Sequence, residues 1–277
     1  MFDTSSICFM GSPEYALPSL IGLHNWVGVR YVITRKDAAK GRSKKQIPTP
    51  IKSWSLAHNI PVFEPESKND LQAVVEKLSP TLIIVIAYGM ILPKKITETY
   101  PCINLHGSIL PKYRGASPIQ AALLNNDDET GVTAIRMNEK MDEGDILTIK
   151  TCRISPSDTG DTLFKKLSHV SFDVLKESLS SKINPYPQDH HNATYCKKLS
   201  TEDRYIKNTH TAEEKLGKIR AFSPRPGAFI KENGQVVKVL EATIIENVLT
   251  PIIVQPEGKS QMTYSDYLRG NRPPINL

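Results

Sequence analysis

Three polar residues in the middle of the chain have the types and spacing of an acyl-transfer site. Asn104 and His106 lie two positions apart in INLHGSILPKYRGASPIQ, so in extended backbone both side chains point to the same face. Asp142, in the acidic turn MDEGD, precedes a further apolar run and can enter the same crevice. The amide would hold a developing oxyanion, the imidazole would move protons or stabilise charge, and the carboxylate would set the imidazole's tautomer.

Two other interpretations of this segment are weaker. A lone histidine at the end of a strand is often a core residue with satisfied hydrogen bonds, but the amide and the carboxylate near His106 favour a functional role. Ser108 follows a glycine that permits close approach of a substrate, yet the segment lacks the G-x-S-x-G pattern of a nucleophilic serine. We therefore expect acyl transfer without a serine nucleophile.

A second candidate site is the stretch from Arg35 to Lys52, RKDAAKGRSKKQIPTPIK, which has no apolar periodicity and is expected to be a long loop. Its seven basic residues are Arg35, Lys36, Lys40, Arg42, Lys44, Lys45 and Lys52, against a single acid, Asp37. Long loops of this kind are usually functional or disordered. The charge favours an arm that binds phosphates and lies loose until a polyanion binds, although a solvated charged loop has the same composition.

The elements that must position these residues alternate between strands and helices over the first 180 residues. Strand-like apolar runs occupy residues 7–10, 27–34, 60–63, 82–87, 102–105, 132–137 and 146–152, and helical patterns occupy 13–24, 51–59, 68–78, 118–125 and 161–180. This alternation predicts an α/β, Rossmann-like, parallel-rich sheet, in which ligands bind beyond the carboxyl ends of the strands. The turn Gly11-Ser12-Pro13-Glu14 matches neither the dinucleotide nor the P-loop pattern.

The pattern changes near residue 184. Residues 184–205 are polar and contain prolines, which predicts an interdomain linker, and the pair His190-His191 is assigned to it. Beyond it we expect a helix over 212–222 and short strands at 228–231, 236–245 and 252–255, with Asn233-Gly234 as a hairpin turn. The predicted domains are therefore a catalytic domain over 1–183 and a small β-rich domain over 206–277.

Composition sets limits on the class of protein. The 277 residues are 39% hydrophobic and 23% charged, which excludes a largely disordered chain, and the net charge of +6 is compatible with an acidic partner such as nucleic acid. The longest apolar run, TLIIVIA, is far short of the roughly 18–20 residues of a membrane helix, and we expect no secretory signal. The four cysteines are scattered and do not cluster with histidines, so we expect thiols in a reducing compartment and no metal.

Several of these segments resemble the folate-dependent formyltransferase family and, within it, the methionyl-tRNA formyltransferases. The resemblance runs in order along nearly the whole chain, through FMGSPEYALPSL, KGRSKKQIPTPIK, VIAYGMILP, NLHGSILPKYRGASPIQ, MDEGDIL and DTLFKKL to TYCKKLS. The core and the acidic turn are shared with the family members that act on glycinamide ribonucleotide and on sugar nucleotides, so they indicate the chemistry. The basic loop and the basic C-terminal domain indicate the substrate.

The resemblance implies a role for particular residues. Asn104, His106 and Asp142 match the catalytic trio; Ser108, Ile109, Leu110 and Pro111 match a tetrahydrofolate contact; Tyr88, Gly89, Met90 and Leu92 match the wall of the pteridine pocket; Lys40, Arg42, Lys44 and Lys45 match a tRNA-binding loop. The implied reaction transfers the formyl group of 10-formyltetrahydrofolate to the α-amine of methionyl initiator tRNA for translation initiation, without a metal. A monomer in the bacterial cytoplasm or an organellar matrix is implied.

The C-terminal part departs from the family pattern. The family's second domain resembles an OB-like β-barrel, and here about 30 residues, the length of two strands, are missing from it, so we expect a shortened barrel. Two alternative functions stay open. One is an amino-sugar nucleotide N-formyltransferase, and the other is a non-catalytic RNA-binding protein on a formyltransferase fold.

Overall fold

The computed structural model describes residues 2–40, 45–180, 183–232, 234–270, 273–275 and 277, and the chain divides into two compact units. Met1–Arg114, Gly131–Cys152 and Lys165–Tyr195 make up the first unit, and Gly115–Thr130, Arg153–Phe164 and Cys196–Leu277 make up the second. The units therefore alternate along the chain. The linear division into domains at residues 183 and 206 stays a prediction.

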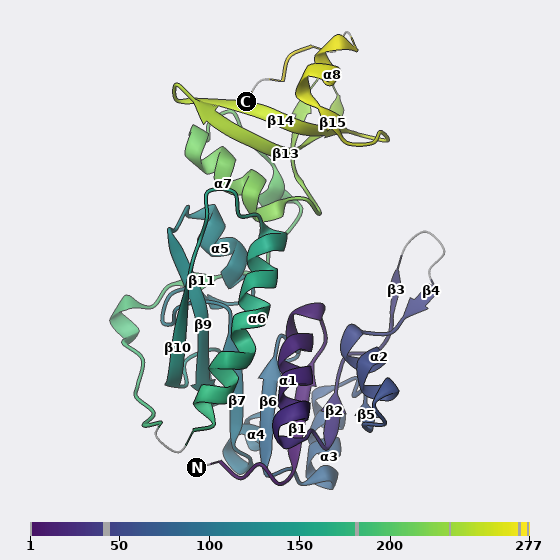
Figure 1. Ribbon diagram of the computed structural model, residues 1–277, viewed down its shortest axis with the longest axis vertical. Helices are drawn as coiled ribbons and strands as arrows, with labels where there is room; N and C mark the ends of the chain where they lie inside the picture. Colours follow the sequence, from purple (N-terminus) through teal and green to yellow (C-terminus); the bar gives the residue numbers. More distant parts are fainter. Residues whose placement is uncertain (1, 41–44, 181–182, 233, 271–272, 276) are drawn as a thin grey trace. The chain divides into compact units, whose positions relative to one another are not determined.

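A seven-stranded sheet lies at the centre of the first unit, in the order β10-β9-β7-β6-β1-β2-β5 (Figure 1). The strands are β1 (Ile7–Gly11), β2 (Tyr31–Ile33), β5 (Val62–Phe63), β6 (Leu82–Ile86), β7 (Cys102–His106), β9 (Glu129–Arg136) and β10 (Asp145–Arg153). The pairs β1–β2, β1–β6, β2–β5 and β6–β7 are parallel, and β7–β9 is antiparallel. The prediction of a parallel-rich α/β sheet is confirmed.

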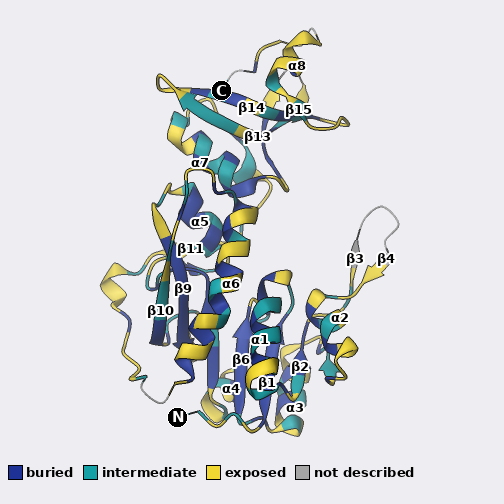
Figure 2. Cartoon of the chain, viewed as in Figure 1, coloured by how far each residue is buried: buried dark blue, intermediate teal, exposed yellow. Residues whose placement is uncertain are grey.

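The central strands are buried along their whole length, which is why their sequences lack polar alternation. All five residues of β1 and all five of β6 are buried (Figure 2). Met10, Ile83 and Val85 pack in one cluster with Leu71 and Val75, which lie on α3 (Lys68–Leu78). The cluster also includes a residue of α4 (Lys94–Thr99). The apolar stripe of α3 therefore covers one face of the sheet.

Helices α1 (Leu17–Val27) and α6 (Gly160–Ser178) lie in front of the sheet in Figure 1. A Cβ atom at Gly22 would lie 2.6 Å from the ring of Phe172, so the contact between α1 and the first-unit part of α6 requires glycine. The Ser168 hydroxyl donates to the Tyr15 carbonyl at 2.7 Å in the same region. The helix predicted over 68–78 has the predicted bounds, and those predicted over 13–24, 51–59 and 161–180 are confirmed with small shifts.

The structure corrects the prediction of a long structureless loop over residues 35–52. Strands β3 (Ala38–Lys40) and β4 (Lys45–Ile47) pair with each other as an antiparallel ribbon, and α2 (Pro50–Ala57) begins directly afterwards. Each strand has three residues, and the two form a separate two-stranded sheet. Ala38, Gln46 and Ile47 of these strands are exposed, and three residues are too few to show an apolar alternation from which a strand could be predicted.

The second unit contains a four-stranded antiparallel sheet in the order β12-β13-β14-β15. Its elements are α5 (Pro118–Leu124), α7 (Ala212–Phe222), β12 (Ala228–Glu232), β13 (Gln235–Ile245), β14 (Val248–Pro256), β15 (Met262–Thr263) and α8 (Tyr264–Arg269). A Cβ atom at Gly217 would lie 2.9 Å from the Leu123 carbonyl oxygen, so α7 packs closely on α5. The predicted helix over 212–222 and the β-rich character are confirmed.

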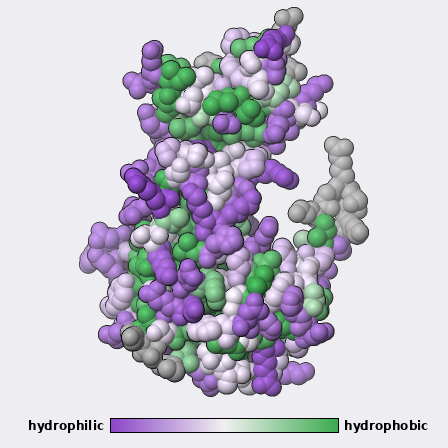
Figure 3. Space-filling model, in the orientation of Figure 1, coloured by the Kyte–Doolittle hydropathy of each residue, from purple (hydrophilic) through white to green (hydrophobic). Residues whose placement is uncertain are grey.

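The order of this sheet is that of a meander. Four described strands are fewer than the five of an OB barrel, in line with a shortened domain. Ile245, Val248 and Ile252 of the β13–β14 hairpin are 55%, 62% and 38% exposed, and Figure 3 shows hydrophobic side chains on the visible face of this sheet. Asn233 of the predicted hairpin turn lies outside the described residues.

The remaining elements are short. β8 (Arg114–Gly115) and β11 (Tyr195–Cys196) lie where the chain passes from one unit to the other, and 3-10 turns occupy Glu14–Ala16, His190–Asn192 and Glu202–Arg204. Within the described part of the chain, none of the helices combines the length and the apolar character that a membrane span requires.

Candidate active site

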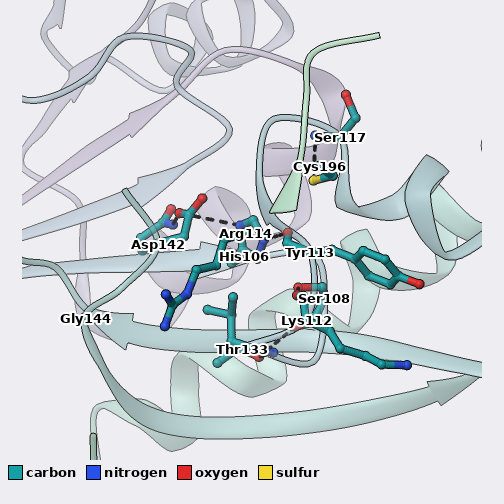
Figure 4. A network of polar contacts seen from close by, with 12 residues as sticks. His106, Ser108, Lys112, Tyr113, Arg114, Ser117, Thr133, Asp142, Gly144 and Cys196 are labelled. Atoms are coloured by element: carbon teal, nitrogen blue, oxygen red, sulfur yellow. Dashed lines mark hydrogen bonds and ion pairs between the residues drawn. The ribbon is translucent and has the colours of Figure 1, made fainter. Parts of the chain in front are cut away.

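Asn104, His106 and Asp142 come together at the carboxyl end of β7. The Asn104 amide nitrogen Nδ2 donates to Asp142 Oδ1 at 3.3 Å, and His106 Nδ1 lies 3.6 Å from the same oxygen (Figure 4). The side chains of His106 and Asp142 are only 6% and 13% exposed. One carboxylate oxygen therefore faces both the amide and the imidazole in a largely desolvated position, where electrostatic interactions are stronger than in water.

The backbone fixes which nitrogen of His106 can exchange a proton. His106 Nε2 lies 2.8 Å from the carbonyl oxygen of Tyr113. A carbonyl only accepts, so Nε2 carries a hydrogen and donates it. Nδ1, on the side of Asp142, is then the nitrogen that takes up or releases a proton during a reaction.

The backbone of the turn that carries Asp142 has a conformation that few residue types tolerate. Asp142 has a φ angle of +55°, in the left-handed region that aspartate tolerates better than most residues. A Cβ atom at Gly144 would lie 1.9 Å from the Arg136 carbonyl oxygen, so only glycine fits there. The position of the carboxylate is thus set by the turn.

The segment after His106 is built around a buried threonine. Thr133 Oγ1 donates to the Ser108 carbonyl at 2.6 Å and accepts from the Leu110 amide at 3.1 Å. The Ser108 hydroxyl is fully buried and donates to the Lys112 carbonyl at 2.6 Å, which is a structural role. Of the four residues predicted to contact a folate, Ser108 and Leu110 are buried, whereas Ile109 and Pro111 are partly exposed.

The residues predicted to form the pteridine wall are also partly buried and partly accessible. Tyr88 and Leu92 are 2% and 8% exposed and belong to the cluster that packs on α3, and burial raises the pKa of the Tyr88 phenol to about 12. Gly89 is exposed and Met90 is half-buried. The accessible members of the predicted folate-contact set are therefore residues 89, 90, 109 and 111.

The predicted tRNA-binding residues are described only in part. Arg42 and Lys44 lie outside the described residues. Lys40 and Lys45 face each other in the backbone register of the β3–β4 ribbon. Lys52 is bound within the protein: its Nζ lies 2.7 Å from Asp37 Oδ1 and 2.8 Å from Glu64 Oε2. The hydrogen bonds that Lys52 donates to Asp37 and, second, to Glu64 raise the pKa of Lys52. Lys52 therefore anchors the base of the ribbon.

Replacing Lys52 with methionine should lower the free energy of unfolding by about 1 kcal/mol and leave the salt dependence of polyanion binding unchanged. The matched variant Arg42→Ala should leave the free energy of unfolding unchanged and reduce the slope of log K against log[salt] by about one. Urea unfolding and RNA binding at several salt concentrations measure the two quantities. If Lys52→Met flattens the slope as much as Arg42→Ala, the anchoring role is wrong.

Three positions that matter for the geometry of the site were not identified in the sequence. Gln188 and Thr194 bond to the backbone around the trio, and Arg114 bonds to the side chain of Gln188. Gln188 and Thr194 lie in the predicted linker. Their polar surroundings in the sequence resemble any surface segment, so only the tertiary structure reveals them. Within the described ranges, no three His, Cys, Asp or Glu side chains are placed to hold a metal ion.

Comparison with known proteins identifies relatives along the whole chain. The formyl transferase family matches residues 20–179, and the formyl transferase C-terminal domain matches residues 198–251. Methionyl-tRNA formyltransferase from Alkaliphilus oremlandii is 36% identical over 301 residues, covering 96% of each chain.

Solved structures share the fold. Methionyl-tRNA formyltransferase from Clostridium thermocellum superposes with a TM-score of 0.64 at 19% identity, over 91% of this chain and 98% of its own. WlaRD, a sugar 3N-formyl transferase solved in the presence of dTDP and 5-N-formyl-tetrahydrofolate, superposes with a TM-score of 0.62 at 19% identity, over 93% of this chain and 100% of its own. The fold is thus shared by formyltransferases with different acceptors.

Proposed function

The chain belongs to the formyl transferase family, and we propose that it transfers the formyl group of 10-formyltetrahydrofolate to the α-amine of methionyl initiator tRNA, the step that prepares this tRNA for translation initiation. The observation that carries the proposal is the contact of both Asn104 and His106 with one oxygen of Asp142, at 3.3 and 3.6 Å. A folate ligand in the WlaRD structure supports the formyl donor.

The trio supplies what formyl transfer needs. When bound, the folate presents a formyl carbon to the attacking amine. Asn104 Nδ2 and a proton on His106 Nδ1 stabilise the negative charge that develops on the formyl oxygen. Asp142 stabilises the charged imidazole. It would also assist movement of the proton from the amine through water to N10 of the folate, as the new bond to the amine forms and the bond between N10 and the formyl carbon breaks. The hydrogen bond from Nε2 to Tyr113 keeps the imidazole in one orientation throughout.

The choice of methionyl-tRNA as acceptor is supported by the whole-chain relatives and by charge. Relatives that align with 96% of this chain are methionyl-tRNA formyltransferases. The stretch over residues 35–52 has seven basic residues and one acid, which suits the phosphates of an acceptor arm. We further propose that residues 206–277 add to the tRNA-binding surface. We also propose that the protein acts as a monomer, which light scattering tests, and that it acts in the bacterial cytoplasm or an organellar matrix.

The direct test is formylation of methionine-charged initiator tRNA with 10-formyltetrahydrofolate. Transfer of the formyl group supports the function and shows that the short C-terminal domain suffices. Absence of transfer, with folate still bound, would contradict it in favour of an amino-sugar nucleotide acceptor, for which the shared fold of WlaRD is the supporting observation. Absence of folate binding would favour a non-catalytic RNA-binding protein.

Reversing two charges in the basic loop tests the substrate. The double variant Arg42→Glu and Lys44→Glu should lower kcat/KM for methionyl-tRNA by about 100-fold or more, since two contacts to phosphates become repulsive. Folate binding measured by titration calorimetry should not change, and Lys68→Glu with Lys77→Glu, two exposed lysines of α3 outside the basic stretch, is the charge-matched control. Equal formylation rates in the double variant and the parent would contradict a tRNA acceptor held by this loop.

A further inference from the structure

We propose that residues 186–195, hereafter the strap, are a positioning element of the active site rather than a passive linker. The strap holds the two backbone groups that orient Asp142 and His106. The activity part of this inference rests on the proposed function, whereas the geometry it predicts can be measured without any substrate. It gives this segment a role in the site in addition to that of the predicted linker over 184–205.

Gln188 is the first contact of the strap with the site. Its Nε2 donates to the carbonyl oxygens of Asp142 at 2.9 Å and Gly144 at 2.8 Å, and the side chain is 4% exposed. Both N–H groups of the amide are therefore used on the turn that carries the catalytic carboxylate. Because Asp142 has a left-handed φ of +55°, the turn benefits from an external clamp.

Arg114 fixes the orientation of that amide. Its Nε and Nη2 donate to Gln188 Oε1 at 3.0 and 2.8 Å, so the oxygen faces the guanidinium and the nitrogen faces the turn. Arg114 is 1% exposed, and its Nη1 lies 3.5 Å from Glu143 Oε1 and 3.2 Å from the Tyr195 hydroxyl. A buried guanidinium with these partners is costly to move, so it is a rigid support.

Thr194 is the second contact of the strap. Its Oγ1 accepts from the Tyr113 amide at 2.8 Å, and its carbonyl accepts from the Arg114 amide at 2.8 Å. Its own amide donates to the Pro111 carbonyl at 3.2 Å. Tyr113 has a φ of +58°, and its carbonyl receives the Nε2 hydrogen of His106, so Thr194 holds the peptide that orients the imidazole.

The other end of the strap is tied to the sheet. Tyr186 and Ile146 exchange backbone hydrogen bonds at 2.8 and 3.1 Å, at the start of β10. The strap is thus fixed at residue 186, at Gln188 and at Thr194. An unanchored linker would make none of these contacts, whereas a positioning element requires all of them.

The variant Gln188→Glu tests whether Gln188 acts through the N–H groups that bond the turn or only through the oxygen that pairs with Arg114. Glutamate keeps an oxygen for Arg114 and adds a charge that pairs with it, but it offers no N–H to the two carbonyls of the turn. We expect kcat to fall about 10- to 100-fold, because displacement of a catalytic group by about 1 Å costs up to about 100-fold. KM for both substrates should stay near that of the parent, and all properties of the control Asn69→Asp, an exposed amide-to-carboxylate substitution on α3, should be parental. A parental kcat for Gln188→Glu would overturn the role of Gln188.

Thr194 provides a second test if Gln188→Glu does not fold. Thr194→Val keeps the shape but removes the acceptor for the Tyr113 amide, and we expect kcat to fall about 10-fold. Thr194→Ser restores the oxygen and should restore kcat. Equal kcat values for Thr194→Val and the parent would overturn the role of Thr194.

A spectroscopic measurement keeps this inference distinct from the proposed function. In ¹⁵N-labelled protein, the His106 Nε2–H signal should shift or broaden in Thr194→Val and return in Thr194→Ser. A parent that transfers no formyl group contradicts the proposed function only. An unchanged His106 signal in Thr194→Val contradicts the strap, whatever the reaction.

Discussion

Replacing His106 with alanine should reduce the rate of formyl transfer to methionyl-tRNA by about 1000-fold. General acid–base catalysis contributes about 10²- to 10⁴-fold in enzymes, and His106 also helps to stabilise the oxyanion. The substitution removes the group on Asp142 Oδ1 that takes up a proton, and it leaves the Tyr113 carbonyl without its donor. Folate and tRNA binding should change little, since the imidazole is 6% exposed and offers little contact area.

Single-turnover formylation with saturating enzyme measures this rate without product release. His58→Ala is the matched control, because His58 is exposed and stacks on Trp54 at 3.9 Å between ring centroids. It should transfer at the parental rate. If His106→Ala retains more than about one tenth of the parental rate, a general acid–base role for His106 is wrong.

Replacing Asn104 with aspartate should be more damaging than replacing it with alanine. Alanine removes a hydrogen-bond donor from the oxyanion, which typically costs about 10²- to 10³-fold. Aspartate removes the same donor and also places a second carboxylate where Asn104 Nδ2 lies 3.3 Å from Asp142 Oδ1. Two carboxylates at this distance repel each other and share a proton, and any remaining charge opposes the developing oxyanion. We expect the order of rates parent, Asn104→Ala, Asn104→Asp.

The comparison is made by single-turnover formylation at a pH above 7, where the attacking amine is largely uncharged. Asn125→Asp, another substitution of asparagine in the chain, controls for the added charge. Equal rates for Asn104→Ala and Asn104→Asp would show that little negative charge develops beside residue 104. Parental activity in either variant would remove Asn104 from the mechanism.

Local signals in the sequence explain why some elements are predicted with their true bounds or within one residue of them. Helices α3 and α7 begin at capping boxes, Ser67 with Asp70 and Thr211 with Glu214, in which each side chain bonds the other residue's backbone. Strands β1 and β6 are uninterrupted apolar runs because both faces are buried. Such features depend on residues close in sequence, so the sequence shows them.

The elements that were missed depend on partners far away in the sequence or leave no pattern. Each strand of the β3–β4 ribbon has three residues and α4 has six, which are too few to show the period of a strand or of a helix. The strap was predicted as linker because Gln188 and Thr194 are polar and lie among prolines and histidines. Gln188 is buried and Thr194 is exposed, but the partners of both lie more than seventy positions earlier in the chain, with sequence separations of 74 and 81 residues for Arg114–Gln188 and Tyr113–Thr194.

The sequence by itself determined the α/β sheet, the common direction of the Asn104 and His106 side chains, and the family. The period of two residues in extended backbone places two side chains on one face wherever the strand lies, so their common direction needs no tertiary information. Only the tertiary structure decided that Asp142 reaches them, that Nδ1 of His106 faces it, and that Arg114, Gln188 and Thr194 hold this arrangement. These contacts join turns and loops that are distant in the chain, and their hydrogen bonds are satisfied only when the folded backbone brings them together.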